Sequence, residues 1–181
     1  TIYTIENGLA LVKSFPNLVA NHEKSFRGLL KRFIYELNDF LDVEGNLIER
    51  LAIFEELQGD LENSFDNKTS DEGFWYDAAA FYGKIGEIHQ SMGQVEEALK
   101  YFDDEVRLFK ELYEANPRSE SVKQSLAISY MKLGEMHQSI GNMEQAFSFF
   151  ENDLELTNEL YKANPQNESL KIGLATSYSK L

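Results

Sequence analysis

The residues best suited to chemistry are two histidines, His89 and His137, which lie 48 positions apart in nearly identical surroundings. An imidazole can act as a general base near neutral pH or as a metal ligand. No acidic residue or second histidine recurs beside either of them at helical spacing. Their equivalence within a repeated segment therefore favours a packing role over catalysis. The third histidine, His22, is predicted to lie in a surface turn.

Other reactive groups also lack a catalytic arrangement. Gly83-Lys84-Ile85-Gly86 does not have the spacing of a nucleotide-binding loop, and it falls inside a predicted helix. The acidic runs Asp103-Asp104-Glu105 and Glu151-Asn152-Asp153 are predicted to form a solvated helix face. The chain has no cysteine, which excludes disulfides and thiolate chemistry. We therefore predict no catalytic residue, no metal site and no cofactor, and hence a protein that is not an enzyme.

The segments that carry these residues repeat with a fixed period. The segment from Tyr82 to Gly93 returns at Tyr130 to Gly141, 48 positions later, and the same offset relates Pro117 and Pro165. About half of the aligned positions are identical. A constant period of this kind predicts a solenoid, in which each unit buries its apolar face against the next. Such an array usually presents a surface to a partner.

Within each unit the pattern predicts two antiparallel α-helices. In one unit the second helix runs from about Gln94 to Ala115, with apolar residues at helical spacing. Asn116-Pro117 ends that helix, because proline cannot continue it. Ser119 or Ser121 can cap the next helix, and Gly141 ends it in a sharp turn. We expect an all-α fold.

The repeat predicts one continuous domain over residues 1–181. Its units are a partial one at 1–30, a weaker repeat at 31–78, full repeats at 79–126 and 127–174, and the start of another at 175–181. The chain starts with Thr1, and it stops at Leu181 where the repeat would place a glycine next. We therefore expect a piece of a longer array.

Composition narrows the class of partner. The formal net charge is −14 and the calculated isoelectric point is about 4.6. Nucleic acids and anionic membranes require clustered lysine and arginine, so neither is expected as the main partner. A basic peptide or basic protein surface remains compatible, although such a charge can also serve solubility alone. No apolar run approaches the roughly 20 residues of a membrane span, and no signal peptide opens the chain, so we expect a cytoplasmic protein.

The repeated residues resemble the core pattern of the tetratricopeptide repeat family. The two sets are Tyr82, Ile85-Gly86, His89, Gly93, Ala98 and Phe102, and then Tyr130, Leu133-Gly134, His137, Gly141, Ala146 and Phe150. The resemblance implies a right-handed superhelical solenoid of antiparallel helix pairs. The family's unit has about 34 residues, so the longer period here implies helices extended by about two turns. Such long-helix units are similar to those in bacterial multidomain proteins beside CHAT protease or signalling ATPase domains.

The resemblance also implies a binding groove, lined by the first helix of each pair. The residues carried over are Ala80, Gly83, Glu87, Gln90 and Ser91 in one unit, Ile128, Met131, Glu135, Gln138 and Ser139 in the next, and then Thr176 and Ser179. The repeated Glu-x-x-Gln-Ser can equally reflect duplication of the unit. We expect charge reversal of Glu87 and Glu135 to weaken partner binding without unfolding the domain.

The leading interpretation is a non-enzymatic interaction scaffold that binds a protein or peptide segment in this groove. The partner segment can be basic or helical. One alternative is a regulatory or sensor arm of a larger multidomain enzyme, such as a CHAT-type caspase-like protease or a signalling ATPase. A second alternative is a structural solenoid that associates end to end, because uncapped repeats expose apolar ends.

Overall fold

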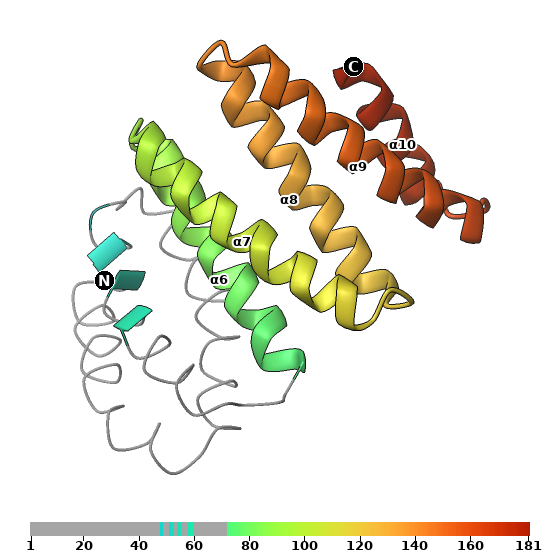
Figure 1. The fold of residues 1–181 in the computed structure, drawn as a ribbon, viewed down its shortest axis with the longest axis horizontal. Helices are drawn as coiled ribbons and strands as arrows, with labels where there is room; N and C mark the ends of the chain where they lie inside the picture. The colour runs from blue at the N-terminus through green and yellow to red at the C-terminus, as the bar shows by residue number, and fades with distance from the viewer. Residues whose placement is uncertain (1–47, 49–50, 53, 56–57, 60–71) are drawn as a thin grey trace, which may run out of the picture.

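The structure, a computed structural model, describes residues 48, 51–52, 54–55, 58–59 and 72–181 (Figure 1). The predicted units at 1–30 and, for all but a few residues, at 31–78 therefore lie outside the described residues. From residue 72 onward the chain is α-helix joined by short turns. The helices are α6 (Glu72–Ser91), α7 (Val95–Ala115), α8 (Glu120–Ser139), α9 (Met143–Ala163) and α10 (Glu168–Lys180). The all-α prediction is confirmed for this part of the chain.

The helices begin and end where the local sequence predicts. The side chain of Ser119 accepts a hydrogen bond from the backbone N–H of Val122 and caps α8. Asn116, just before a proline, follows the last residue of α7. Gly93 and Gly141 have φ angles of 73° and 79° in the turns after α6 and α8. These left-handed conformations suit glycine because it has no Cβ.

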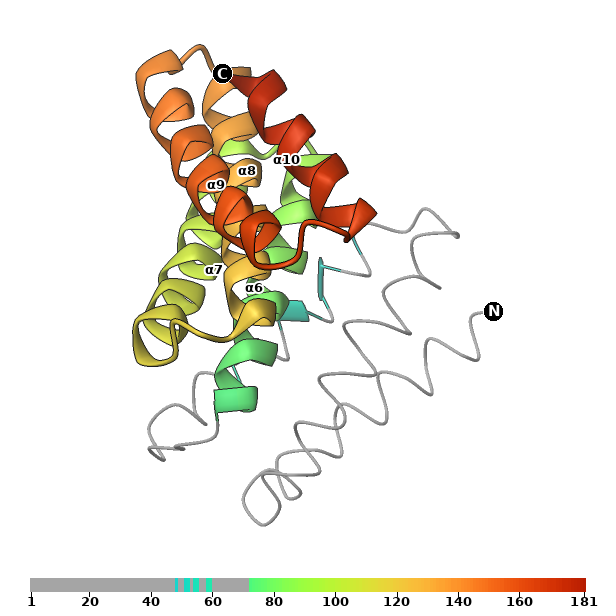
Figure 2. The same ribbon diagram turned by 90° about the vertical axis from the view of Figure 1, so that its right-hand side faces the viewer.

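The helices form two layers. Each helix from α6 to α9 packs against the one that follows it in the chain. Figure 2 shows α6, α8 and α10 on one side and α7 and α9 on the other. The first helices of successive pairs thus share a layer, as expected for a helical solenoid of the tetratricopeptide type. We call the outer side of α6, α8 and α10 the first-helix face.

Aromatic rings fill the space between the layers. Phe102 and Phe150, one from each second helix, are 0% and 2% exposed. A Cβ added at Gly86 would lie 2.7 Å from the ring of Phe102, and one at Gly134 would lie 2.5 Å from the ring of Phe150. Glycine in mid-helix is unfavourable by about 1 kcal/mol relative to alanine. The close approach of the rings explains the presence of glycine at both positions.

Candidate functional site

The first-helix face carries most of the predicted groove residues. Gln90, Ser91, Ile128, Gln138 and Ser139 are exposed, Ala80, Glu87, Met131 and Glu135 are half-buried, and Gly83 is buried. They come from α6 and α8, and Thr176 and Ser179 continue the set as exposed residues on α10. The array therefore brings the set to one side of the molecule, with Gly83 beneath the surface.

The two predicted groove glutamates form ion pairs between neighbouring units. Glu87 on α6 lies 2.9 Å from the Nζ of Lys132 on α8, and 2.8 Å from the Nζ of Lys84. One repeat later, Glu135 on α8 lies 2.6 Å from the Nζ of Lys180 on α10. Burial raises the pKa of Glu87, but the two lysines outweigh this effect and bring the pKa below its usual value. Charge reversal here would disturb contacts between units as well as any partner contact.

The predicted solvated acidic face is wrong at two positions, because Glu105 and Asp153 are buried at 5% and 3% exposure. Glu105 accepts hydrogen bonds from Lys132 at 3.2 and 3.4 Å. A Cβ at Gly83 would collide with the Glu105 carboxylate, so this glycine makes room for a buried acid. Burial raises the pKa of Glu105 above its usual value, and Lys132 offsets this only in part. The spacing of apolar residues did not predict the burial of Glu105 and Asp153, because each of these acids lies in a run of polar residues.

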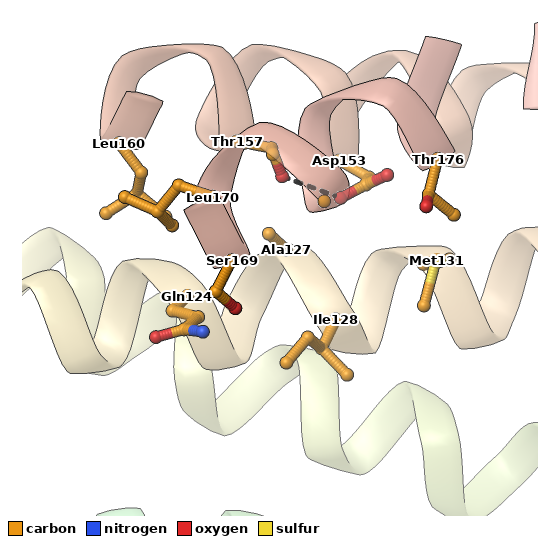
Figure 3. Close-up of a pocket in the computed structure, with 11 residues that line it drawn as sticks. Gln124, Ala127, Ile128, Met131, Asp153, Thr157, Leu160, Ser169, Leu170 and Thr176 are labelled. Carbon is orange, nitrogen blue, oxygen red and sulfur yellow. Dashed lines mark hydrogen bonds between the residues drawn. The ribbon is translucent and has the colours of Figure 1, made fainter. Parts of the chain in front are cut away.

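Beside Asp153 the first-helix face opens into a cavity of about 210 Å³ between α8 and α10, with α9 as its floor (Figure 3). Three predicted groove residues, Ile128, Met131 and Thr176, line it together. Gln124 at the rim is exposed, as are Ile128 and Thr176, so the cavity communicates with solvent. We call this space the α8–α10 cavity.

Asp153 lies at the floor of the α8–α10 cavity. Its Oδ1 accepts a hydrogen bond from the Thr157 hydroxyl at 3.0 Å. Its Oδ2 is buried and has no hydrogen-bond partner among the described residues. The Ser177 hydroxyl lies close enough to the carboxylate to lower its pKa, but in the structure it donates its proton to the carbonyl of Gly173 at 3.1 Å. Figure 3 shows the carboxylate between Thr157 and Thr176, with its second oxygen on the side of Thr176.

The two histidines pack within their helix pairs, as predicted. The His89 ring stacks on Tyr101 with centroids 5.2 Å apart, and the His137 ring stacks on Phe149 at 5.4 Å. His89 Nδ1 also lies 2.6 Å from the side-chain oxygen of Gln94. Among the described residues, no group of three or more histidine and acidic side chains is arranged to hold a metal ion. Both histidines thus have a structural role in holding first and second helices together.

The comparison with known families agrees with this architecture. Residues 79–108, which start in α6 and end in α7, match the family model for the tetratricopeptide repeat. The chain thus contains a segment that matches a tetratricopeptide repeat. Tetratricopeptide repeats generally mediate protein–protein interactions and are generally not enzymes. No curated protein matches the chain. Among the described residues, no helix has the length and apolar character needed to cross a membrane.

Proposed function

We propose that this protein is a non-enzymatic interaction scaffold that binds a segment of a protein or peptide on its first-helix face. The observation that carries the proposal is the α8–α10 cavity, because predicted groove residues from two successive units meet there. Ile128 is a large apolar side chain that is 43% exposed at its rim. A concave, largely apolar space with a few polar groups is typical of a recognition site.

A basic segment is the partner that the charge of the chain favours. With a net charge of −14, the protein attracts cationic segments and repels anionic ones over distances of about a Debye length. A helical segment would also fit a face built from parallel first helices. The proposed location is the cytoplasm, as expected from the sequence. The regulatory-arm alternative has no separate support in the described residues.

A matched pair of lysine substitutions tests the proposal. Peptides that bind the protein are selected from a random phage-displayed library and synthesised for calorimetry. Ile128→Lys adds one positive charge at the cavity rim, whereas Ser148→Lys adds one on α9, where the preceding repeat already has Lys100. We expect Ile128→Lys to weaken peptide binding at least about tenfold and Ser148→Lys to leave it within about twofold.

The proposal fails if the selected peptides bind Ile128→Lys as tightly as the parent protein. It also fails if the two substitutions weaken binding equally, because a general charge effect would then account for the loss. Circular dichroism and urea unfolding of both variants show whether the helices remain intact, and a third variant, Gln138→Lys, repeats the test at an exposed position of the same face.

A second candidate function is self-association through α10. Tyr178 and Leu181 are 60% and 46% exposed, whereas their counterparts one repeat earlier, Tyr130 and Leu133, are half-buried and buried. An apolar helix face of this kind can stack on another copy of the chain. Sedimentation over a range of concentrations tests it: the parent mass should rise, and a Tyr178→Glu variant should stay monomeric. A constant parent mass removes this candidate.

A further inference from the structure

The α8–α10 cavity lies at the junction between α8 and α10, whereas at the preceding junction, between α6 and α8, side chains at the equivalent positions contact one another. There, Tyr76 forms a hydrogen bond of 2.7 Å with Ser125, and its ring packs edge-on against Phe109 with centroids 5.2 Å apart. One repeat later these three positions hold Gln124, Gly173 and Thr157, and all three line the cavity. The rings of Tyr76 and Phe109 are thus replaced by the side chains of Gln124 and Thr157, and the side chain of Ser125 is replaced by a hydrogen atom. These smaller side chains leave the space between the helices open.

The buried acid at the floor also differs between the junctions. Glu105 is paired with Lys132, whereas its counterpart Asp153 is one methylene shorter. The equivalent lysine, Lys180, instead lies 2.6 Å from Glu135. The second junction therefore keeps a buried carboxylate and, among the described residues, gives its Oδ2 no donor.

A buried carboxylate oxygen without a donor is unfavourable, so a ligand that supplies one is favoured in the cavity. The walls include the apolar side chains of Ile128, Met131, Leu160 and Leu170. Lysine combines a flexible stem of four carbons with a compact ammonium group. A purely apolar side chain would fit the walls but leave Asp153 unsatisfied, and an acidic side chain would be repelled by it.

We infer that the α8–α10 cavity is a recognition site for a lysine side chain of a partner segment, with the stem between Ile128 and Met131 and the ammonium on Asp153. The inference rests on the proposed function, since the lysine belongs to a segment bound on the first-helix face. The ammonium takes the place that Lys132 holds against Glu105 in the preceding unit. A partner chain thus completes an ion pair that the chain itself makes one repeat earlier.

The test uses N-acetyl-lysine methylamide as the probe and N-acetyl-norleucine methylamide as its uncharged control. NMR titration follows the methyl signals of Met131, Thr157 and Thr176, which surround the carboxylate. We expect the lysine probe to shift these signals saturably and the norleucine probe to bind at least about tenfold more weakly. Asp153→Asn keeps the shape and the acceptor for Thr157, and it should weaken lysine binding to the level of norleucine.

A second variant fills the cavity by copying the preceding junction: Gln124→Tyr, Thr157→Phe and Gly173→Ser together. It should fold and lose the saturable shifts. Equal binding of both probes, undiminished binding by Asp153→Asn, or no saturable shift in the parent would overturn the inference. Binding of the selected peptides distinguishes a failure of this inference from a failure of the proposed function. If Ile128→Lys weakens them but Asp153→Asn and the filled variant do not, the first-helix face remains the binding surface and the lysine site is wrong.

Discussion

At the scale of single residues, paired positions change together between the two junctions. Gly83 leaves room for the long carboxylate of Glu105, whereas Met131 at the equivalent place is accompanied by the shorter Asp153. The methionine side chain is larger than the single methylene that the acid loses, and both Met131 and Asp153 line the α8–α10 cavity. Close packing requires the glycine at position 83, because a Cβ there would collide with the Glu105 carboxylate.

Two mid-helix glycines provide a test of this packing. Gly134→Ala would place a methyl group 2.5 Å from the Phe150 ring, so we expect a loss of about 1 to 3 kcal/mol in the free energy of unfolding. Gly173→Ala would meet Thr157 at an ordinary contact distance of 3.7 Å, and it should stabilise the protein by up to about 1 kcal/mol. Urea unfolding measures both. Similar changes in the two variants would show that backbone propensity, rather than the ring, decides the effect.

The buried carboxylate of Asp153 predicts a pH-dependent stability. Burial raises its pKa above the ordinary value of 3.8, and the polar neighbours Ser177 and Thr157 offset this only in part. Between the ordinary and the raised pKa the folded protein binds more protons at this site than the unfolded chain, so the site makes unfolding easier as pH rises. Asp153→Asn does not titrate.

The free energy of unfolding of Asp153→Asn, relative to the parent, should therefore increase as pH rises from about the ordinary pKa of aspartate and level off above the raised pKa. Urea unfolding of both proteins at a series of pH values measures this difference. A difference that stays constant or decreases with pH would contradict the assignment of a raised pKa to this group.

At the scale of elements, ion pairs and caps join helices whose apolar faces alone do not fix their register. Lys132 on α8 reaches Glu87 on α6 and Glu105 on α7, and so connects three helices. Burial lowers the pKa of Lys132, but the two glutamates outweigh this effect and raise it above its usual value. The lysine is therefore charged across the neutral range, and the contact persists there.

The N-caps of α9 and α10 form a matched pair for a prediction. Asn167 accepts hydrogen bonds from the backbone N–H groups of Ser169 and Leu170, at 3.0 and 3.3 Å. Asn142 occupies the same position before α9 but makes no side-chain cap bond. We expect Asn167→Ala to reduce the protection of α10 amides from hydrogen exchange by about 1 kcal/mol. Asn142→Ala should change α9 protection by less than about 0.5 kcal/mol, and a larger loss at α9 would contradict this explanation.

At the scale of the whole molecule, the stability of the described region is unevenly distributed. The hydrophobic core draws its buried residues from Phe54 and from α6, α7, α8 and α9, whereas Ser177 is the only buried residue of α10. Local opening is easiest where few apolar contacts hold an element. Because α10 forms one wall of the α8–α10 cavity, we expect this wall to move away from the rest of the protein more readily than α8 or α9.

Hydrogen exchange tests this distribution directly. Amides of α10 should exchange with a lower free energy of opening than those of α7 and α8, and binding of a selected peptide should raise protection in α10 more than in α6. Equal protection of α8 and α10 in the free protein would contradict the prediction. An increase confined to α6 would place the peptide elsewhere on the first-helix face.

The helices of the described region, their ends and the repeated core follow from the sequence alone. Glycines at the turns, a proline after Asn116 and a cap at Ser119 act through local backbone geometry, and Gly86 and Gly134 recur with the fixed period of the repeat. Whether a polar residue is buried, in contrast, depends on the tertiary structure. Whether Glu105 and Asp153 are solvated or buried depends on how neighbouring helices are rotated and offset, which side-chain periodicity within one helix does not specify. The cavity likewise exists because three residues distant in sequence are each too small or too polar to close one junction.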